Sequence, residues 1–123
     1  DFGLDWSYTI PDRARARLIC GRCVLSTDAT LIVRRVQLNL RHGANVIARS
    51  ANYGSQSNRL TLAYTLTPGS DIASANVGLD WFLHFPPGLF LAPGDTVSVA
   101  TANLQPGDRW RRIYLRMLTT IEA

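Results

Sequence analysis

The chain has 123 residues, with 13 basic residues against nine acidic ones, which gives a net charge of +4. This length suits one domain, residues 1–123, able to bury about two-thirds of its unfolded surface without metal or disulfide bonds. No apolar run reaches the roughly 18 residues of a membrane-spanning helix, and the N-terminus lacks a secretion-signal pattern, although a start at Asp1 rather than methionine is compatible with a missing leader.

Every basic residue is arginine, and Glu122 is the one glutamate. Lysine and glutamate normally fill exposed helix faces, so their scarcity argues against amphipathic helices. The positive net charge suggests an acidic partner surface or nucleic acid, and the alternative is a mildly basic surface with no dedicated partner.

The first half of the chain alternates apolar with polar residues and therefore predicts β-strands. The expected strands cover residues 4–10, 13–25, 30–40 and 46–49. Gly21 interrupts the second strand, and the phase of the third reverses at Arg34 and Arg35. Both positions are predicted to be β-bulges.

The second half continues the pattern with strands expected at 60–66, 77–85, 96–101 and 113–121. Polar loops near residues 52–58 and 70–76 separate the earlier ones. Pro-Gly-Asp turns at residues 93–95 and 106–108 bracket the strand at 96–101. In such a turn proline fixes φ, glycine takes a positive φ, and aspartate accepts backbone N–H bonds.

Seven or eight strands at spacings of about ten to fifteen residues, with no convincing helix, predict an all-β fold. We expect an antiparallel β-sandwich. The long loops near residues 50 and 70 favour an eight-stranded jelly roll over an immunoglobulin-like sandwich, which usually has more compact spacing.

The two cysteines, Cys20 and Cys23, form a lone Cys-x-x-Cys pair. A zinc site needs a second pair of ligands, and a thioredoxin-like site needs a βαβ unit. His42 and His84 lie far apart in the sequence and have no ligand spacing. We therefore expect two reduced, structural thiols and no metal or other cofactor.

An enzyme is not expected, because no Ser-His-Asp or Cys-His order stands out. Four aspartates could in principle supply carboxylates for glycoside hydrolysis or calcium binding: Asp28, Asp80, Asp95 and Asp108. Three of them are ordinary turn residues.

Several short motifs follow one another along the chain. A Leu-x-Thr-Asp-Ala-Thr turn leads into Arg-Arg-Val, and a Pro-Gly-Asp corner precedes Thr-x-Asn-Leu-Gln-x-Gly-Asp-x-Trp. The residues are Leu25, 27–30, 34–36, 93–95, Thr101, 103–105, Gly107, Asp108 and Trp110. In these motifs the chain resembles small virion-associated proteins of tailed bacteriophages. Such proteins tend to have Val-Ala-Asn before the arginines, where this chain has residues 31–33, Leu-Ile-Val.

This resemblance implies a structural virion protein without catalytic residues. The role it implies is a capsid decoration or cement protein, a homotrimer that binds the major capsid protein or another virion protein at the capsid surface. Guanidinium groups suit such interfaces because they stack and form bidentate bonds. The candidate interface residues are Leu89, Phe90, Arg109, Trp110, Arg111 and Arg112.

Other interpretations of the same residues stay open. Trp110 could lie in the core with its flanking arginines solvated, and Leu89 and Phe90 could plug a corner. A carbohydrate- or receptor-binding jelly-roll module of a phage fibre or spike is the main rival, with Trp6, Tyr53 and Trp81 as stacking platforms. Nucleic acid is disfavoured because no recognised binding motif is present.

Overall fold

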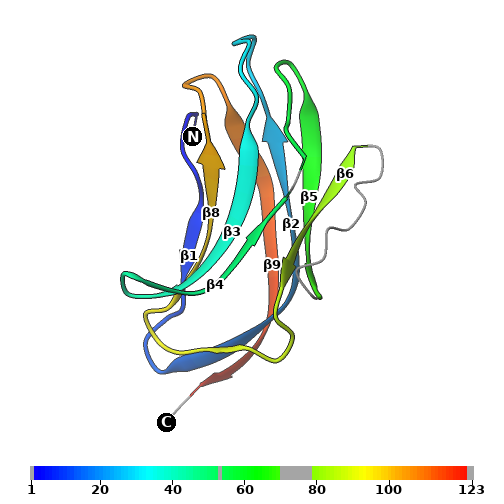
Figure 1. Ribbon diagram of the computed structural model, residues 1–123. Coiled ribbons are helices and arrows are strands. Elements are labelled where there is room, and N and C mark those ends of the chain that lie inside the picture. The colour runs from blue at the N-terminus through cyan, green and yellow to red at the C-terminus, as the bar shows by residue number, and fades with distance from the viewer. Residues whose placement is uncertain (1, 53, 70–78, 122–123) are drawn as a thin grey trace.

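The computed structural model describes residues 2–52, 54–69 and 79–121, and these residues form two β-sheets that pack face to face (Figure 1). The four-stranded sheet has the order β1–β8–β3–β4, and the five-stranded sheet has β6–β5–β2–β7 with β9 paired to β2. The strands are β1 Ser7–Thr9, β2 Ala14–Ser26, β3 Arg35–His42, β4 Asn45–Ala51, β5 Thr61–Pro68, β6 Asp80–Phe85, β7 Phe90–Leu91, β8 Thr96–Ala102 and β9 Arg109–Ile121. The described ranges contain no helix, so the predicted all-β sandwich is confirmed.

One pair of strands departs from the antiparallel arrangement that the sequence predicts. β5 and β6 run parallel, with Tyr64 beside Trp81, whereas every other pair among the described strands is antiparallel. A hairpin cannot join parallel strands, which need a crossover of about a dozen residues. Residues 69–79 provide a connection of that length.

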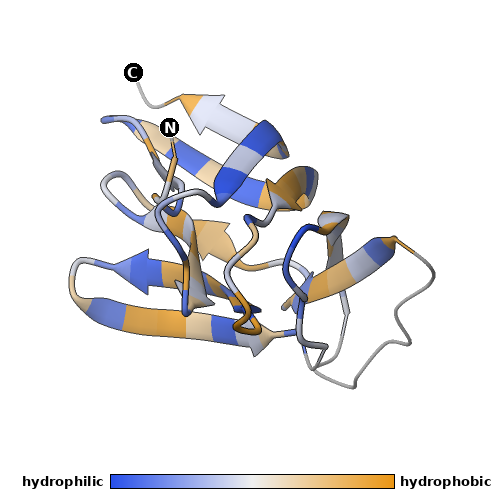
Figure 2. Ribbon diagram, turned by 90° about the horizontal axis from the view of Figure 1, so that it is seen from above, coloured by the Kyte–Doolittle hydropathy of each residue, from blue (hydrophilic) through white to orange (hydrophobic). Residues whose placement is uncertain are grey.

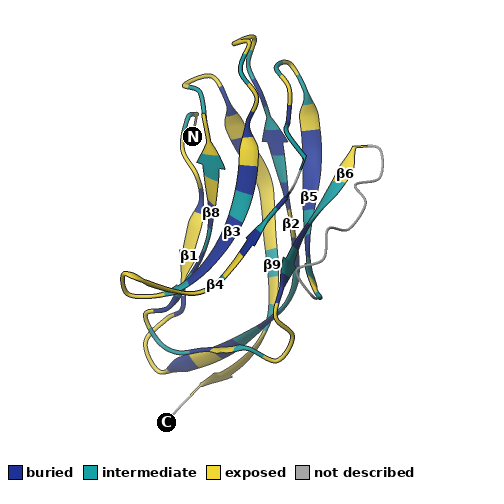
Figure 3. Cartoon of the chain, viewed as in Figure 1, coloured by how far each residue is buried: buried dark blue, intermediate teal, exposed yellow. Residues whose placement is uncertain are grey.

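The core fills the space between the two sheets, which separate into layers when seen along the strands (Figure 2). β5 is more buried than the half-buried strand that its alternation predicts, because Ala63 is buried as well as Leu62 and Tyr64, whereas the C-terminal part of β9 is largely exposed (Figure 3). Tyr64 lies at the centre, with its ring centroid 5.6 Å from that of Trp110 and 5.9 Å from that of Trp81. These three rings therefore pack together, with Tyr64 and Trp110 inside the core and Trp81 against it.

The expected bulge at Gly21 is wrong, because this residue pairs regularly with both Leu66 and Leu115. The register between β2 and β9 shifts on either side of it instead. A side-chain carbon at Gly21 would lie 2.8 Å from the backbone oxygen of Tyr114. Close approach of the neighbouring strand, not a bulge, is what requires glycine here.

A bulge at Ile19 changes which residues of β2 face the core. Leu18 pairs with Met117 and Cys20 with Arg116, so Ile19 is an extra residue. Before the bulge the even-numbered residues are buried, and after it the odd-numbered residues are buried. One extra residue thus exchanges the faces of the strand.

The expected strand at residues 30–40 is wrong in its first part, since β3 begins only at Arg35. The residues before it form a loop that exposes Leu31 and Val33 and buries the side chain of Arg34 completely. The reversal of phase in the sequence therefore marks a buried arginine rather than a bulge.

Candidate functional site: an arginine face

The outer surface of the β2–β9 pair carries six arginines. Because alternate residues of a strand point to opposite faces, the core-facing residues Ala16, Leu18 and Leu25 define which neighbours point outward. The arginines on this outer side are Arg15, Arg17, Arg22, Arg109, Arg111 and Arg116. We call this surface the arginine face.

The register of the two strands keeps these arginines from lying directly opposite one another. On β2 they face Thr120, Leu118 and Tyr114, in the order Arg15, Arg17, Arg22. On β9, Arg109, Arg111 and Arg116 face Ser26, Val24 and Cys20. Like charges directly opposite on neighbouring strands are destabilising, and this staggered register avoids them.

Interactions within the protein orient several of these guanidinium groups. Arg22 forms an ion pair of 3.1 Å with Asp80, both side chains being half exposed. Arg111 donates to Ser26 Oγ at 3.4 Å, and Arg109 lies 5.1 Å from the ring centroid of Phe2. The groups remain at the surface, where a partner can reach them.

Exposed apolar side chains lie among the arginines. Tyr114, Leu118 and Phe90 are 57%, 56% and 64% exposed. Phe90 pairs with Arg17, so it belongs to the same face. Arginine mixed with aromatic and aliphatic groups is typical of protein interfaces.

The structure places the predicted interface residues in different environments. Arg109 and Arg111 lie on the arginine face, and Arg112 is exposed with a positive φ of 52° where the β2–β9 register shifts. Trp110 lies in the core at 5% exposure, and its Nε1 donates to Asp5 Oδ1 at 3.0 Å. Trp110 is therefore not an exposed anchor, in agreement with the alternative interpretation of the sequence.

The predicted corner lies at the other end of this surface. Leu89 is half-buried and packs against the core, while Phe90 is exposed. Phe90 pairs with Arg17 and Arg111 with Val24, so about 23 Å of β2 separates them at 3.3 Å per residue. The structure places both groups on one face but does not bring them together.

A buried ion cluster, which the sequence did not predict, holds one end of the sandwich. Arg34 is fully buried, and its Nε and Nη2 donate to the two carboxylate oxygens of Asp108 at 2.9 Å each. Its Nη2 also donates to Asp28 Oδ1 at 2.6 Å, and its Nη1 to the backbone oxygens of Thr30 and Ile32. This cluster, which we call the arginine clamp, joins the loops before β3 and before β9.

The two Pro-Gly-Asp turns contain the same hydrogen bond from a backbone N–H to the aspartate three residues later. Asp95 Oδ2 accepts from the backbone N–H of Ala92, and Asp108 Oδ2 accepts from that of Gln105, each at 2.8 Å. Asp95 also contacts His42 Nδ1, as Asp108 contacts Arg34. Both carboxylates thus hold the backbone of their own turns and bind a basic side chain.

The reason for glycine differs between these turns. Gly94 has a φ of +85°, as the turn chemistry predicts. Gly107 does not have a left-handed φ, and the prediction is wrong there. A side-chain carbon at Gly107 would lie 2.6 Å from Asp28 Oδ2, so glycine is required by the approach of the arginine clamp.

Both cysteines have free thiols, as expected. They lie three residues apart on β2, about 10 Å at the rise of a strand, which is too far for a disulfide. Burial raises the pKa of Cys23 to about 12. Cys23 is therefore buried in the core, and its thiol stays protonated and unreactive at neutral pH.

The proposed sugar platforms are poorly placed. Trp6 is 9% exposed and Trp81 packs against the core, while Tyr53 lies outside the described residues. A stacking platform needs an open aromatic face. Trp6 exposes little of its ring, and Trp81 is only partly exposed.

Among residues 2–52, 54–69 and 79–121, no group of three histidine, cysteine or acidic side chains could hold a metal ion. The described part of the chain has no helix with the length and hydropathy to cross a membrane. No protein-family model, curated protein or solved structure matches the chain.

Proposed function

We propose that this protein is a structural virion protein of a tailed bacteriophage, a decoration or cement protein that binds the head as a homotrimer and stabilises it. The arginine face carries the proposal, because it is a basic, partly apolar surface on two long paired strands. The sequence motifs shared with small phage virion proteins support the virion assignment. The partner is the major capsid protein or another virion protein with an acidic surface.

The arginine face suits carboxylate groups for physical reasons. Guanidinium binds carboxylate in a bidentate manner and is less strongly hydrated than an ammonium group, so it loses less on burial. Each desolvated pair contributes about 1–3 kcal/mol. Six arginines on a rigid surface therefore provide both affinity and orientation.

The jelly-roll assignment is part of this proposal. Its support is the nested pairing of strands, in which β2 pairs with β9 in one sheet and β3 with β8 in the other. The connections β2–β3 and β8–β9 thus both cross between sheets. A jelly roll arises when such a double ribbon folds over.

The test is a salt series of binding to heads stripped of this protein, with light scattering to count protomers. The double variant Arg111→Glu with Arg116→Glu should lose binding, and the matched control Arg35→Glu with Arg49→Glu, on the other sheet, should retain most of it. High salt should weaken binding, because the Debye length falls from about 10 Å at 0.1 M to about 3 Å at 1 M, but should leave the trimer intact.

Three results would contradict the proposal. These are a monomer at all concentrations, binding that is indifferent to charge reversal on the arginine face, and equal losses in the control variant. A specific signal on a glycan array would favour the carbohydrate-binding alternative. Binding of duplex DNA with a steep salt dependence would instead assign the arginine face to nucleic acid.

A further inference from the structure

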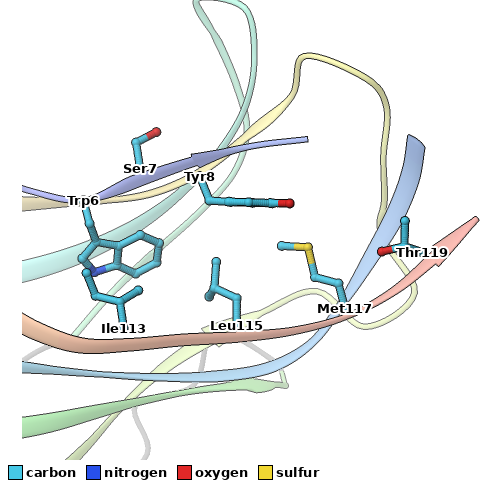
Figure 4. Close-up of a pocket in the computed structure, with 7 residues that line it drawn as sticks. All are labelled: Trp6, Ser7, Tyr8, Ile113, Leu115, Met117 and Thr119. Atoms are coloured by element: carbon cyan, nitrogen blue, oxygen red, sulfur yellow. The ribbon is translucent and has the colours of Figure 1, made fainter. Parts of the chain in front are cut away.

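The sandwich is open on the side where β1 and β9 form the edges of the two sheets. A groove of about 500 Å³ lies between them (Figure 4). Trp6 and Tyr8 point into it from one sheet and Ile113, Leu115 and Met117 from the other (Figure 4). The inward side of β9 is therefore only partly covered.

The outer edge of β9 has almost no partner of its own. Among the described residues only Phe2 pairs with it, through a bridge to Arg109, and the backbone N–H of Gly3 donates to the oxygen of Asp108 at 2.7 Å. Below this bridge the edge of residues 113–121 is open. The N-terminal segment thus pairs with the beginning of this edge and leaves the rest of it without a partner among the described residues.

Natural edge strands are usually protected by shortness, proline, bulges, charged side chains (especially lysine) or a covering loop. β9 has 13 residues and no proline, and of its four arginines only Arg116 lies in the open part of the edge. The register with β2 shifts at two places: the extra residue on β9 lies near Arg112, before the open part of the edge, and the other extra residue, Ile19, belongs to β2 opposite Arg116 and Met117. Ile113 and Ile121 at the two ends of this part are 45% and 77% exposed.

The positive charge of β9 indicates which kind of added strand fits beside its edge. An added strand would point alternate side chains inward, over Leu115 and Met117, and outward beside Arg116. β9 has four arginines and no acidic residue. A second copy of β9 would bring its own arginines to the arginine face, whereas an acidic strand would complement it.

We propose that the free edge of β9 binds an extended segment of a partner protein in which apolar residues alternate with acidic ones. The apolar residues fill the groove between β1 and β9, and the acidic residues extend the arginine face. The groove runs from Ile113 to Thr119, which corresponds to about seven residues of strand, or about 24 Å. This site adjoins the proposed capsid contact, with which it shares Arg116, but it does not depend on the virion assignment.

The probe is a capped nine-residue peptide that alternates glutamate with valine. In nuclear magnetic resonance titrations it should bind with a Kd at or below about 1 mM and slow the exchange of outward-pointing amides in residues 113–119. The same peptide with lysine in place of glutamate, and one of equal composition without alternation, should bind much more weakly.

Charge reversal supplies the decisive comparison. Arg116→Glu should weaken binding of the glutamate peptide roughly fivefold and strengthen the lysine peptide by a similar factor. The control Arg35→Glu, on the opposite sheet, should change neither by more than about twofold. Arg116 is exposed, so the variant should fold.

No binding at several millimolar peptide would overturn the inference. So would binding that leaves the amides of 113–119 unprotected, or that ignores the change at Arg116. Protection of the same amides by a second copy of the chain, undisturbed by the peptide, would instead assign the edge to self-association.

Discussion

Arg34 and Arg35 are adjacent arginines with opposite environments, which makes them a matched pair. Arg34→Met should lower the free energy of unfolding by about 3–5 kcal/mol, because it leaves the fully buried carboxylate of Asp108 without its partner. Arg35→Met, at an exposed position, should change it by no more than about 0.5 kcal/mol. Urea unfolding measures both, and similar losses in the two variants would show that the clamp does not stabilise the fold.

Asp28 should make stability sensitive to acid. The backbone N–H of Thr30, assisted by that of Gly107 and by Arg34, lowers the pKa of Asp28 below its usual value of 3.8. A carboxylate with a lowered folded pKa stabilises the protein fully above its unfolded pKa, and this stabilisation disappears as the pH falls through the folded pKa.

The variant Asp28→Asn should therefore be less stable than the parent at pH 7, and its stability should fall less steeply below about pH 4. Unfolding curves between pH 2 and pH 7, in steps of about one unit, provide the comparison. Asp12→Asn, in an exposed turn, is the control. Parallel curves for parent and Asp28→Asn would refute this role of the carboxylate.

The two thiols should differ in reactivity. With a pKa of about 12 and no exposed surface, Cys23 should resist alkylation at pH 8 until the protein unfolds, whereas the half-buried Cys20 should react in the native state. Mass spectrometry of tryptic peptides after timed labelling distinguishes them. Equal rates would mean that the core opens locally around Cys23.

At the scale of the turn, the two Pro-Gly-Asp corners should respond differently to alanine. Gly94→Ala should cost about 1–2 kcal/mol, since only the positive φ opposes it and the space around it is open. Gly107→Ala should cost at least about 2–3 kcal/mol, because the new methyl group displaces Asp28 from the arginine clamp. Thermal unfolding ranks the two, and the reverse order would contradict the structural reason given for Gly107.

The sequence predicted strands well where apolar residues that face the core simply alternate with polar residues. β5 and β8 follow simple alternation, and their inward residues Leu62, Leu66 and Val97 are buried as expected. The prediction failed where a contact from a distant segment decides the conformation. The phase change at Arg34 depends on Asp108, and the parallel pairing of β5 with β6 depends on a crossover, so neither follows from local periodicity.

The arginine face could be predicted only in part. Alternation on β2 indicated one charged side, but the bulge at Ile19 and the register with β9 decide that Arg22 shares a face with Arg15 and Arg17. Trp110 was ambiguous because an aromatic residue beside arginines suits a core edge as well as an interface. The edge groove had no local signal, since it depends on β1 and β9 meeting from opposite ends of the chain.

For the molecule as a whole, hydrogen exchange should follow the order of strands in the sheets. Amides of β2, β3, β5 and β8, which have neighbours on both sides, should exchange slowest. Every second amide of residues 113–121, pointing to the open side, should exchange fast in dilute protein. Slow exchange at all of these positions would show that another chain already covers the edge.

The pairing of β2 with β9 also affects how the protein is made. Ala14 pairs with Ile121 and Ser26 with Arg109, so β2 leaves the ribosome long before its principal neighbour has been synthesised. During this interval its edge could pair with another nascent chain. Arg15, Arg17 and Arg22 place charge along this stretch, as gatekeeper residues do beside aggregation-prone segments. Half of the arginine face is thus already present on the unfinished chain, where its charge opposes pairing with other chains before the finished protein has any partner to bind.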